Sequence, residues 1–261
     1  MLSGLSDKKI ILLLNTNWGR RACREIIRRK DGFIPLLINI LDQTINDPSF
    51  NNNDLHIPAA LLLAQMREPQ AYSRLVKLIA YDEKGVDLLW GDLLTEHYVE
   101  MLRDTFNGDS SLIPQLAENH SVEPFARSMA LYAWGMHYGD GHISRDDITR
   151  YFRHLIHDVY TGKPNNNDKI VLSAIAYCIR EHQLDELIDE VKTIYDRNGI
   201  DKLHCGNCNE YVNDFNNSMY RATHEHIDDA IHVLQKWGWF KKSELSEDFE
   251  EDYDDFDEDD D

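Results

Sequence analysis

The stretch 146–159, DDITRYFRHLIHDV, carries the strongest fold signal in this sequence. Its apolar residues recur at steps of 3, 4, 7, 8 and 11, so they all fall on one stripe of a helix with 3.6 residues per turn. This spacing predicts an amphipathic helix with one buried face. The same spacing recurs in 70–81, 184–195 and 224–238, which we expect to form helices of the same kind.

Segments of a second kind precede three of these stretches. Residues 57–66 (IPAALLLAQM), 125–136 (FARSMALYAWGM) and 170–179 (IVLSAIAYCI) are apolar on nearly every side and rich in alanine. A helix that is apolar all round has to be covered all round, and alanine lets neighbouring backbones approach closely. The alternation predicts stacked helical hairpins, each with a covered inner helix and a solvated outer helix. The inner-helix residues predicted to be buried are Leu62, Ala64, Ala130, Trp134, Ile175 and Ala176.

A further helix pair fits between the first two inner segments. Residues 86–94 and 95–106 have helical spacing, and a short helix is expected near 112–118. No stretch alternates apolar and polar residues over strand length between turn signals, which argues against a sheet. We therefore predict an all-α fold, a HEAT-like α-solenoid of stacked hairpins with a right-handed superhelical path. This repeat domain is expected to span residues 1–243.

The charge of the chain is concentrated at its end. Of 261 residues, 47 are acidic and 27 are basic, giving a formal net charge of −20. Residues 244–261 (ELSEDFEEDYDDFDEDDD) hold 13 of the acidic residues and no basic one. So acidic a chain is a poor ligand for phosphate backbones or anionic lipid, and no apolar run approaches the roughly 20 residues that span a bilayer. With four cysteines and no signal peptide, we expect a cytoplasmic protein with no nucleic-acid or membrane partner.

The acidic tail 244–261 is the predicted partner-binding segment. Phe249, Tyr253 and Phe256 are spaced by 4 and 3 residues, so they would share one face if the tail folded as a helix on a protein partner. Unbound, the tail should be disordered, because its like charges repel and it has little apolar surface to bury. A tail that only solubilises the protein, with incidental aromatic residues, is the alternative, and both interpretations stay open.

One basic cluster stands out in the first part of the chain. It contains Arg20, Arg21, Arg24, Arg28, Arg29 and Lys30. On a helix, Arg20, Arg24 and Arg28 share one face at a spacing of four. Such a face is usually only solvated, but it could also contact nucleic acid or an acidic partner, including the tail of the same chain.

The candidates for metal binding are weak. Cys205 and Cys208 form a C-x-x-C, with His204 before it and His224, His226 and His232 after it. A structural zinc site usually has two closely spaced ligand pairs, whereas here the second pair would be a His-x-His or a His-x5-His after a long gap. His-Glu dyads of the kind that bind iron in helical-repeat hydroxylases are represented once, at 224–225. We therefore expect no metal and no cofactor.

No catalytic motif is present either. The sequence has no Gly-x-Ser-x-Gly elbow, phosphate loop or dinucleotide fingerprint, so no catalytic residue is predicted. Cys178 lies in an apolar run and is expected to be a core residue. His154 and His157 could pair on one helix face, but half-exposed surface histidines are the simpler interpretation.

The order of several segments resembles a known family. The segments are residues 24–48 (REIIRRKDGFIPLLINILDQTINDP), 57–60 with 62–64 and 67–71, 91–92 with 95–96, 127–133, 141–152 and 195–201. They resemble the bacterial family catalogued as domain of unknown function 1186, over roughly residues 20–240. The resemblance implies a helical-repeat fold and no defined activity or functional residues. Some relatives carry a cysteine-rich metal-binding motif at the C-terminus, where this chain has its acidic tail.

The sequence leaves three hypotheses for function. The first is a non-enzymatic protein-interaction module, because stacked hairpins form an extended surface without an intrinsic catalytic pocket. The second is a metal-dependent enzyme or metal-binding protein that uses histidine and cysteine groups towards the C-terminal part of the repeat. The third, acidic mimicry of nucleic acid, depends on the tail alone. Elemental analysis of the purified protein would separate the first two.

Overall fold

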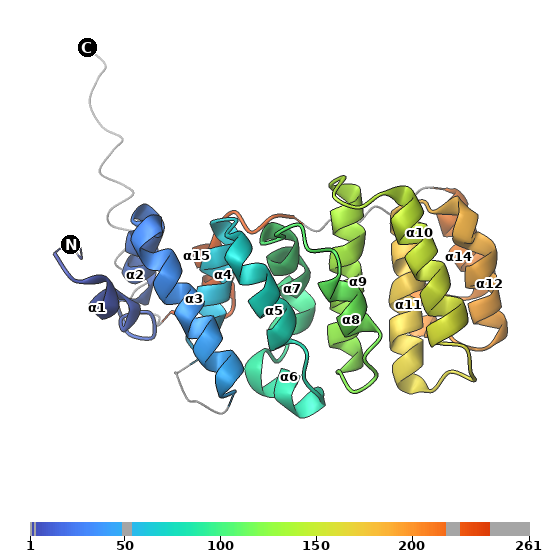
Figure 1. The fold of residues 1–261 in the computed structure, drawn as a ribbon, viewed down its shortest axis with the longest axis horizontal. Helices are drawn as coiled ribbons and strands as arrows, with labels where there is room; N and C mark the ends of the chain where they lie inside the picture. Colours follow the sequence, from blue (N-terminus) through green and yellow to red (C-terminus); the bar gives the residue numbers. More distant parts are fainter. Residues whose placement is uncertain (1, 3, 49–53, 218–224, 241–261) are drawn as a thin grey trace, which may run out of the picture. The chain divides into compact units, whose positions relative to one another are not determined.

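The computed structural model describes residues 2, 4–48, 54–217 and 225–240 (Figure 1). All regular structure in these ranges is helical, which confirms the predicted all-α class. None of their helices is long and apolar enough to cross a membrane. The contacts divide the chain into two compact units, Met1–Ala71 with Ile227–Asp261 (unit 1) and Tyr72–His226 (unit 2). The predicted boundary at residue 244 lies outside the described residues.

Unit 1 joins the two ends of the chain. Its last helix, α15, packs against α2 and α4, and Figure 1 shows it beside α4. Trp239 Nε1 donates a hydrogen bond to the carbonyl oxygen of Leu14 at 3.2 Å, and Arg67 Nη1 donates to that of Ile227 at 2.9 Å. The described helices of unit 1 are α1 (Asp7–Ile11), α2 (Gly19–Arg28), α3 (Lys30–Asn46), α4 (His56–Gln65), η1 (Pro69–Ala71) and α15 (Ala230–Lys236).

The helix expected over 224–238 is shorter than predicted. Only Ala230–Lys236 is helical, and the described residues before it are not. Asp229 sets the start of α15, because its carboxylate accepts a hydrogen bond from the His232 backbone N–H at 2.9 Å. Residue Ile227 is buried although it precedes the helix, so its place in the apolar pattern was correct and its helical conformation was not.

Unit 2 is built around α9. This helix packs against α7 and α11, and the three follow one another in chain order in Figure 1. The shorter helices α8 and α10 also pack against α9. The described helices of unit 2 are α5 (Tyr72–Leu78), α6 (Glu83–Leu89), α7 (Leu93–Asp104), α8 (Leu112–Ala117), α9 (Pro124–Gly139), α10 (Arg145–His154), η2 (Leu155–Val159), α11 (Asn166–Glu181), η3 (Asp185–Leu187), α12 (Ile188–Asp196), α13 (Lys202–Cys205) and α14 (Cys208–Asn216).

The alanine-rich helices form the core, as predicted. The six residues assigned to inner helices are all at most 4% exposed: Leu62, Ala64, Ala130, Trp134, Ile175 and Ala176. The run 125–136 is not covered on every side, because Phe125 at its start is 47% exposed. It also buries a charge that the pattern did not anticipate. Arg127 is 1% exposed, and its Nη1 donates to the hydroxyl of Tyr160 at 2.9 Å.

The predicted helix over 146–159 divides into two forms. Ser144 caps α10, since its Oγ accepts from the Asp147 backbone N–H at 3.1 Å. The α-helix ends at His154, and residues 155–159 continue as a π-helical turn, η2. The wider π turn places its side chains differently from an α-helical continuation, and such turns are frequent at functional sites.

Candidate functional site

An open groove lies beside α10 in unit 2. It has a volume of about 840 Å³ and is bounded by α8, α9, the loop before α10, α10 itself and η2. Volumes of this size fit a small molecule or a short stretch of peptide. The lining residues are Ser110, Pro114, Trp134, His142, Ile143, Asp147, Arg150, Tyr151, Arg153, His154, His157 and Asp158.

The floor of the groove is aromatic. The rings of Trp134 on α9 and Tyr151 on α10 meet edge to face, with centroids 5.8 Å apart. Tyr151 donates to the carbonyl oxygen of Pro114 at 3.4 Å, and burial raises its pKa. Trp134 is 4% exposed, and its Nε1 has no hydrogen-bond partner among the described residues. A buried donor without an acceptor is energetically costly, so this indole lowers the stability of the site.

The rim of the groove carries cations and histidines from one helical face. Arg150 pairs with Asp147, and the Arg153 Nε lies 2.7 Å from the Glu190 carboxylate. His154 Nδ1 lies 2.9 Å from Asp158, one turn further along, and His157 is exposed. The rim therefore offers guanidinium and imidazole donors that a carboxylate or carbonyl ligand could share.

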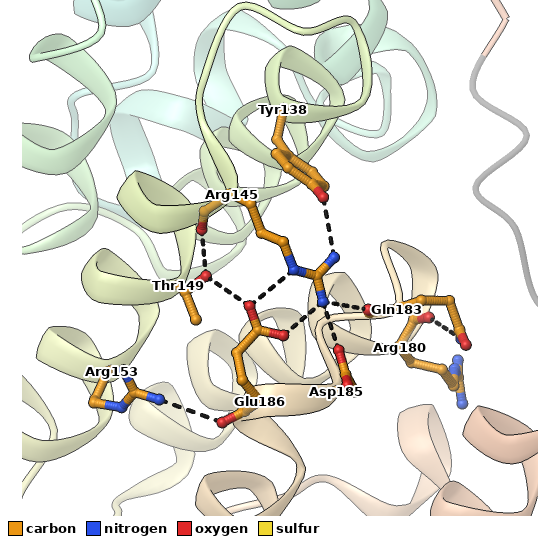
Figure 2. Close-up of polar contacts among 8 residues, drawn as sticks. All are labelled: Tyr138, Arg145, Thr149, Arg153, Arg180, Gln183, Asp185 and Glu186. Carbon is orange, nitrogen blue, oxygen red and sulfur yellow. Dashed lines mark hydrogen bonds and ion pairs between the residues drawn. The ribbon is translucent and has the colours of Figure 1, made fainter.

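A network centred on Arg145 fixes α10 to the segment after α11 (Figure 2). The Arg145 guanidinium contacts both oxygens of Glu186, with Nε–Oε1 at 2.9 Å and Nη2–Oε2 at 2.5 Å. Its Nη2 also donates to Asp185 at 2.6 Å and to the Gln183 carbonyl oxygen at 2.9 Å, and its Nη1 donates to Tyr138 at 3.2 Å. Bidentate pairing of this kind constrains the geometry of both partners. The network thus holds the helix that forms one wall of the groove.

The network also depends on pH. The hydrogen bonds from Arg145 are the largest cause that lowers the pKa of Glu186, which falls from 4.5 to about 2. Thr149 adds a hydrogen bond to the same carboxylate at 3.2 Å, and Arg153 donates to the Glu186 backbone carbonyl at 3.3 Å. The Glu186 carboxylate is therefore charged throughout the neutral range.

A second, smaller hollow of about 270 Å³ lies where α9, α11 and α13 approach one another. Tyr132 and His204 face each other there, with the hydroxyl 2.9 Å from Nε2. Burial is the largest cause that lowers the pKa of His204. The remaining lining residues are Thr95, Phe125, Ser128, Met129, Ile170, Ser173 and Asp201.

The cysteine pair is divided between two helices. Cys205 ends α13 and Cys208 begins α14, and both are free thiols. Cys205 is 3% exposed and contacts the Ser173 carbonyl oxygen through Sγ at 3.6 Å. Burial raises the pKa of Cys205 to about 12, so its thiol stays protonated at neutral pH and is a poor nucleophile or metal ligand in that state.

The histidines proposed as partners of these cysteines have other contacts or lie outside the description. His204 bonds to Tyr132, and His226 Nδ1 lies 2.5 Å from the buried carboxylate of Asp104. His232 is on α15 in unit 1, and residue 224 is outside the described ranges. Within those ranges no group of three histidine, cysteine or acidic side chains is placed to hold a metal. The expectation of no metal stays a prediction.

The sequence identified only part of the groove. It proposed His154 and His157 as a pair and then favoured simple surface histidines, whereas both line the groove. It assigned Trp134 to the core and passed over Arg150 and Arg153. A usable signal was present, because polar residues 150, 153, 154 and 157 follow the same helical spacing as the apolar stripe. The predicted partner-binding residues Phe249, Tyr253 and Phe256 lie outside the described residues.

The described residues form an all-helical fold with an open groove, and the comparisons give its family. Residues 8–241 match the model described as "Protein of unknown function (DUF1186)", so the chain belongs to this family, as the resemblance implied. An uncharacterized protein of Chlamydia muridarum is 28% identical over 237 residues, 84% of this chain and 90% of the relative. One of Chlamydia trachomatis is 29% identical over 167 residues, 62% and 66% of the two chains. No solved structure matches.

Proposed function

We propose that this protein is a non-enzymatic protein-interaction module that binds a segment of a partner protein in the groove beside α10. The observation that carries the proposal is the aromatic floor formed by Trp134 and Tyr151 beneath a rim of arginine and histidine donors. A peptide supplies what this lining favours, apolar side chains for the floor and a side-chain carboxylate for the rim.

An arrangement of unit 2 as stacked helical hairpins would support this function. In the chain order α7, α9, α11, each of these helices contacts the next, as neighbouring repeats of a HEAT-like solenoid would do. Repeats of this kind present extended surfaces to partners. We place the protein in the cytoplasm and give it a protein partner in preference to nucleic acid or membrane, because its net charge of −20 opposes binding to polyanions.

A peptide-display selection on the purified chain tests the proposal. Selected peptides should shift the NMR signals of residues that line the groove. They should bind a variant with Arg150→Glu and His157→Glu at least about tenfold more weakly, because the new carboxylates repel an acidic ligand. A matched control places Lys77→Glu and Lys84→Glu on exposed positions elsewhere in unit 2. Peptides that bind the groove variant and the control equally well would contradict the proposal.

The metal hypothesis has its own discriminating measurement. Elemental analysis of the purified protein should find no stoichiometric transition metal if the interaction module is the correct assignment. One equivalent of metal that disappears in a Cys205→Ser, Cys208→Ser variant would favour the alternative, since metal affinity and folding would then be linked through these thiols.

A further inference from the structure

The basic helix α2 lies in unit 1, as do the described residues 227–240, which precede the acidic tail in the sequence. Residues 20–30 contain six basic residues and one acidic residue, whereas residues 244–261 contain 13 acidic residues and no basic one. Arg28 binds Glu25 through two hydrogen bonds, and Arg29 pairs with Asp7 and Glu25. The sequence thus carries a strongly cationic segment near its start and a strongly anionic segment at its end.

The start of the tail is anchored at the beginning of α2. Phe240, the last residue before the tail region, is 5% exposed. Its ring packs so closely on Gly19 that a methyl group there would lie 3.2 Å from it. Trp239 is held to Leu14, just before α2, by the hydrogen bond described above. Phe240, the last described residue, therefore lies beside the first turn of α2.

The lengths of the two segments match. The ten residues of α2 make a helix about 15 Å long. Phe249 follows Phe240 by nine residues, which reach at most about 30 Å when extended. Residues 244–256 can therefore lie along the whole helix. A short tether also raises the effective concentration of the tail at this helix to the order of millimolar.

The α2 surface also has an aromatic element that suits the tail. Trp18, which precedes the helix, is 44% exposed, and the Arg21 guanidinium lies 5.0 Å from the centre of its ring. An exposed indole beside guanidinium groups fits a ligand that alternates carboxylates with aromatic rings. Residues 244–261 have this composition, with Phe249, Tyr253 and Phe256 among their acids.

From this combination we infer that the face of α2 formed by Arg20, Arg21 and Arg24 is a binding site for an acidic, aromatic peptide, and that residues 244–261 of the same chain are its occupant. An external acidic ligand must then displace the tail before it reaches these arginines. The site is in unit 1 and is independent of the groove beside α10.

A competition experiment tests the inference with the full-length protein. In one variant the 13 acidic residues of the tail are changed to their amides, which leaves the helices unaltered. A synthetic peptide of residues 244–261 should bind this variant, shift the NMR signals of residues 19–30, and bind the wild-type chain at least about tenfold more weakly because the resident tail competes. The affinity should fall steeply as salt is raised from about 0.05 M to about 0.5 M.

Two further variants identify the contacts. Changing Arg20, Arg21 and Arg24 to Gln in the tail-neutralised chain should abolish peptide binding, whereas changing the exposed Lys77, Lys84 and Lys202 of unit 2 to Gln removes the same charge and should leave binding intact. A peptide with Phe249, Tyr253 and Phe256 replaced by Ser should bind more weakly at constant charge.

Each contrary outcome overturns the inference. Equal peptide affinity for the wild-type and tail-neutralised chains would show that the tail does not occupy the face. Absence of binding, or shifts outside residues 19–30, would show that the face is not the site. If oligouridylate bound α2 with the same affinity in the wild-type and tail-neutralised chains, this face would instead be a nucleic-acid surface.

Discussion

The two compact units handle charge in opposite ways. In unit 2 the buried side chains include several ionisable ones, namely Asp104, Glu123, Arg127, His137, Arg180 and Glu181. In the described residues of unit 1 the buried polar side chains are Thr44 and His56, and the arginines of α2 lie at the surface or are half-buried. Unit 2 therefore buries both acidic and basic side chains, whereas in the described part of unit 1 the buried ionisable side chain is His56 and the arginines of α2 keep some contact with solvent.

The helices α10 and α2 show the same difference on a smaller scale. Both have ten residues and several arginines. The partners of Arg145 and Arg153 lie on a different segment, at Glu186 and Glu190, so these ion pairs fasten two elements together. On α2, Arg28 pairs with Glu25 of the same helix, whereas Arg29, directly after α2, pairs with Asp7 of α1. The position of the carboxylate decides whether an arginine connects two elements or stays within its own helix.

The largest effect should come from acid titration of the core of unit 2. His137 stacks on Phe106 with ring centroids 4.0 Å apart, and burial lowers its pKa from 6.5 to about 3. A histidine held neutral in the fold contributes stability that is present above pH 6.5 and is lost as the pH falls from 6.5 towards 3. Each pH unit in this window corresponds to about 1.4 kcal/mol. The free energy of unfolding, measured with urea, should fall between pH 6.5 and pH 4 in both proteins. In a His137→Phe variant this fall should be about 3 kcal/mol smaller than in the wild type.

The control for this titration is a histidine of the same unit that is exposed. His157→Phe removes an imidazole from the groove rim and should leave the pH dependence of the wild type unchanged. Parallel stability curves for the wild-type and His137→Phe proteins would contradict the claim that the protonation state of His137 supports unit 2.

The next effect tests the packing of the inner helices. Ala130 on α9 is fully buried, so Ala130→Leu should destabilise the protein by about 1–3 kcal/mol through overpacking. The same substitution at the exposed Ala80 should have little effect. Chemical denaturation measures both. An Ala130→Leu protein as stable as the wild type would show that α9 is not tightly enclosed by its neighbours.

A smaller effect should come from the ion-pair network of α10. Arg145→Met removes the bonds to Asp185, Glu186 and Gln183 and should cost about 1 kcal/mol at pH 7, a figure reduced for the partial exposure of these side chains. The folded pKa of Glu186 is lowered, so the stability it contributes is present above pH 4.5 and is lost as the pH falls towards 2. The difference between variant and wild type should shrink over that range. A difference independent of pH would show that Arg145 acts through packing alone.

The smallest effect should appear on α2. Arg24→Met changes an exposed side chain of the arginine face and should alter the free energy of unfolding by less than about 0.5 kcal/mol. A loss as large as that of Arg145→Met would remove the contrast between the two helices, because Arg24 would then also be fastening parts of the fold.

The sequence located most helices because helical periodicity is local. Apolar spacing predicts which side chains are buried in each helix. The structure buries both the stripe at Ile148, Phe152 and Leu155 and the apolar run around Ala130. Local rules also explain several helix ends, including the cap at Ser144 and the left-handed residues Gly141 and Asn198. The π turn after His154 was not predictable from the periodicity, because the spacing of apolar residues does not show whether the hydrogen bonds of one turn span four residues or five.

The groove was less accessible to sequence reasoning. Polar residues on α10 gave a visible stripe, but Trp134 comes from α9 and Pro114 from α8. A cavity is the space that packed elements leave between them, and the spacing within one element does not record it. The same limit applies to Arg145, because its contact with Glu186 depends on where the fold places the turn that contains Glu186.

By itself, the sequence determined the all-α class, the burial of the alanine-rich helices and the separation of a basic cluster from an acidic end. Only the tertiary structure decided that α15 returns to α2 and α4 and packs Phe240 on Gly19. The physical reason is the range of the interactions. Hydrogen bonds and apolar spacing within a helix act over a few residues, whereas contacts between residues more than 200 positions apart depend on the complementary shapes of surfaces that exist only once the helices have formed.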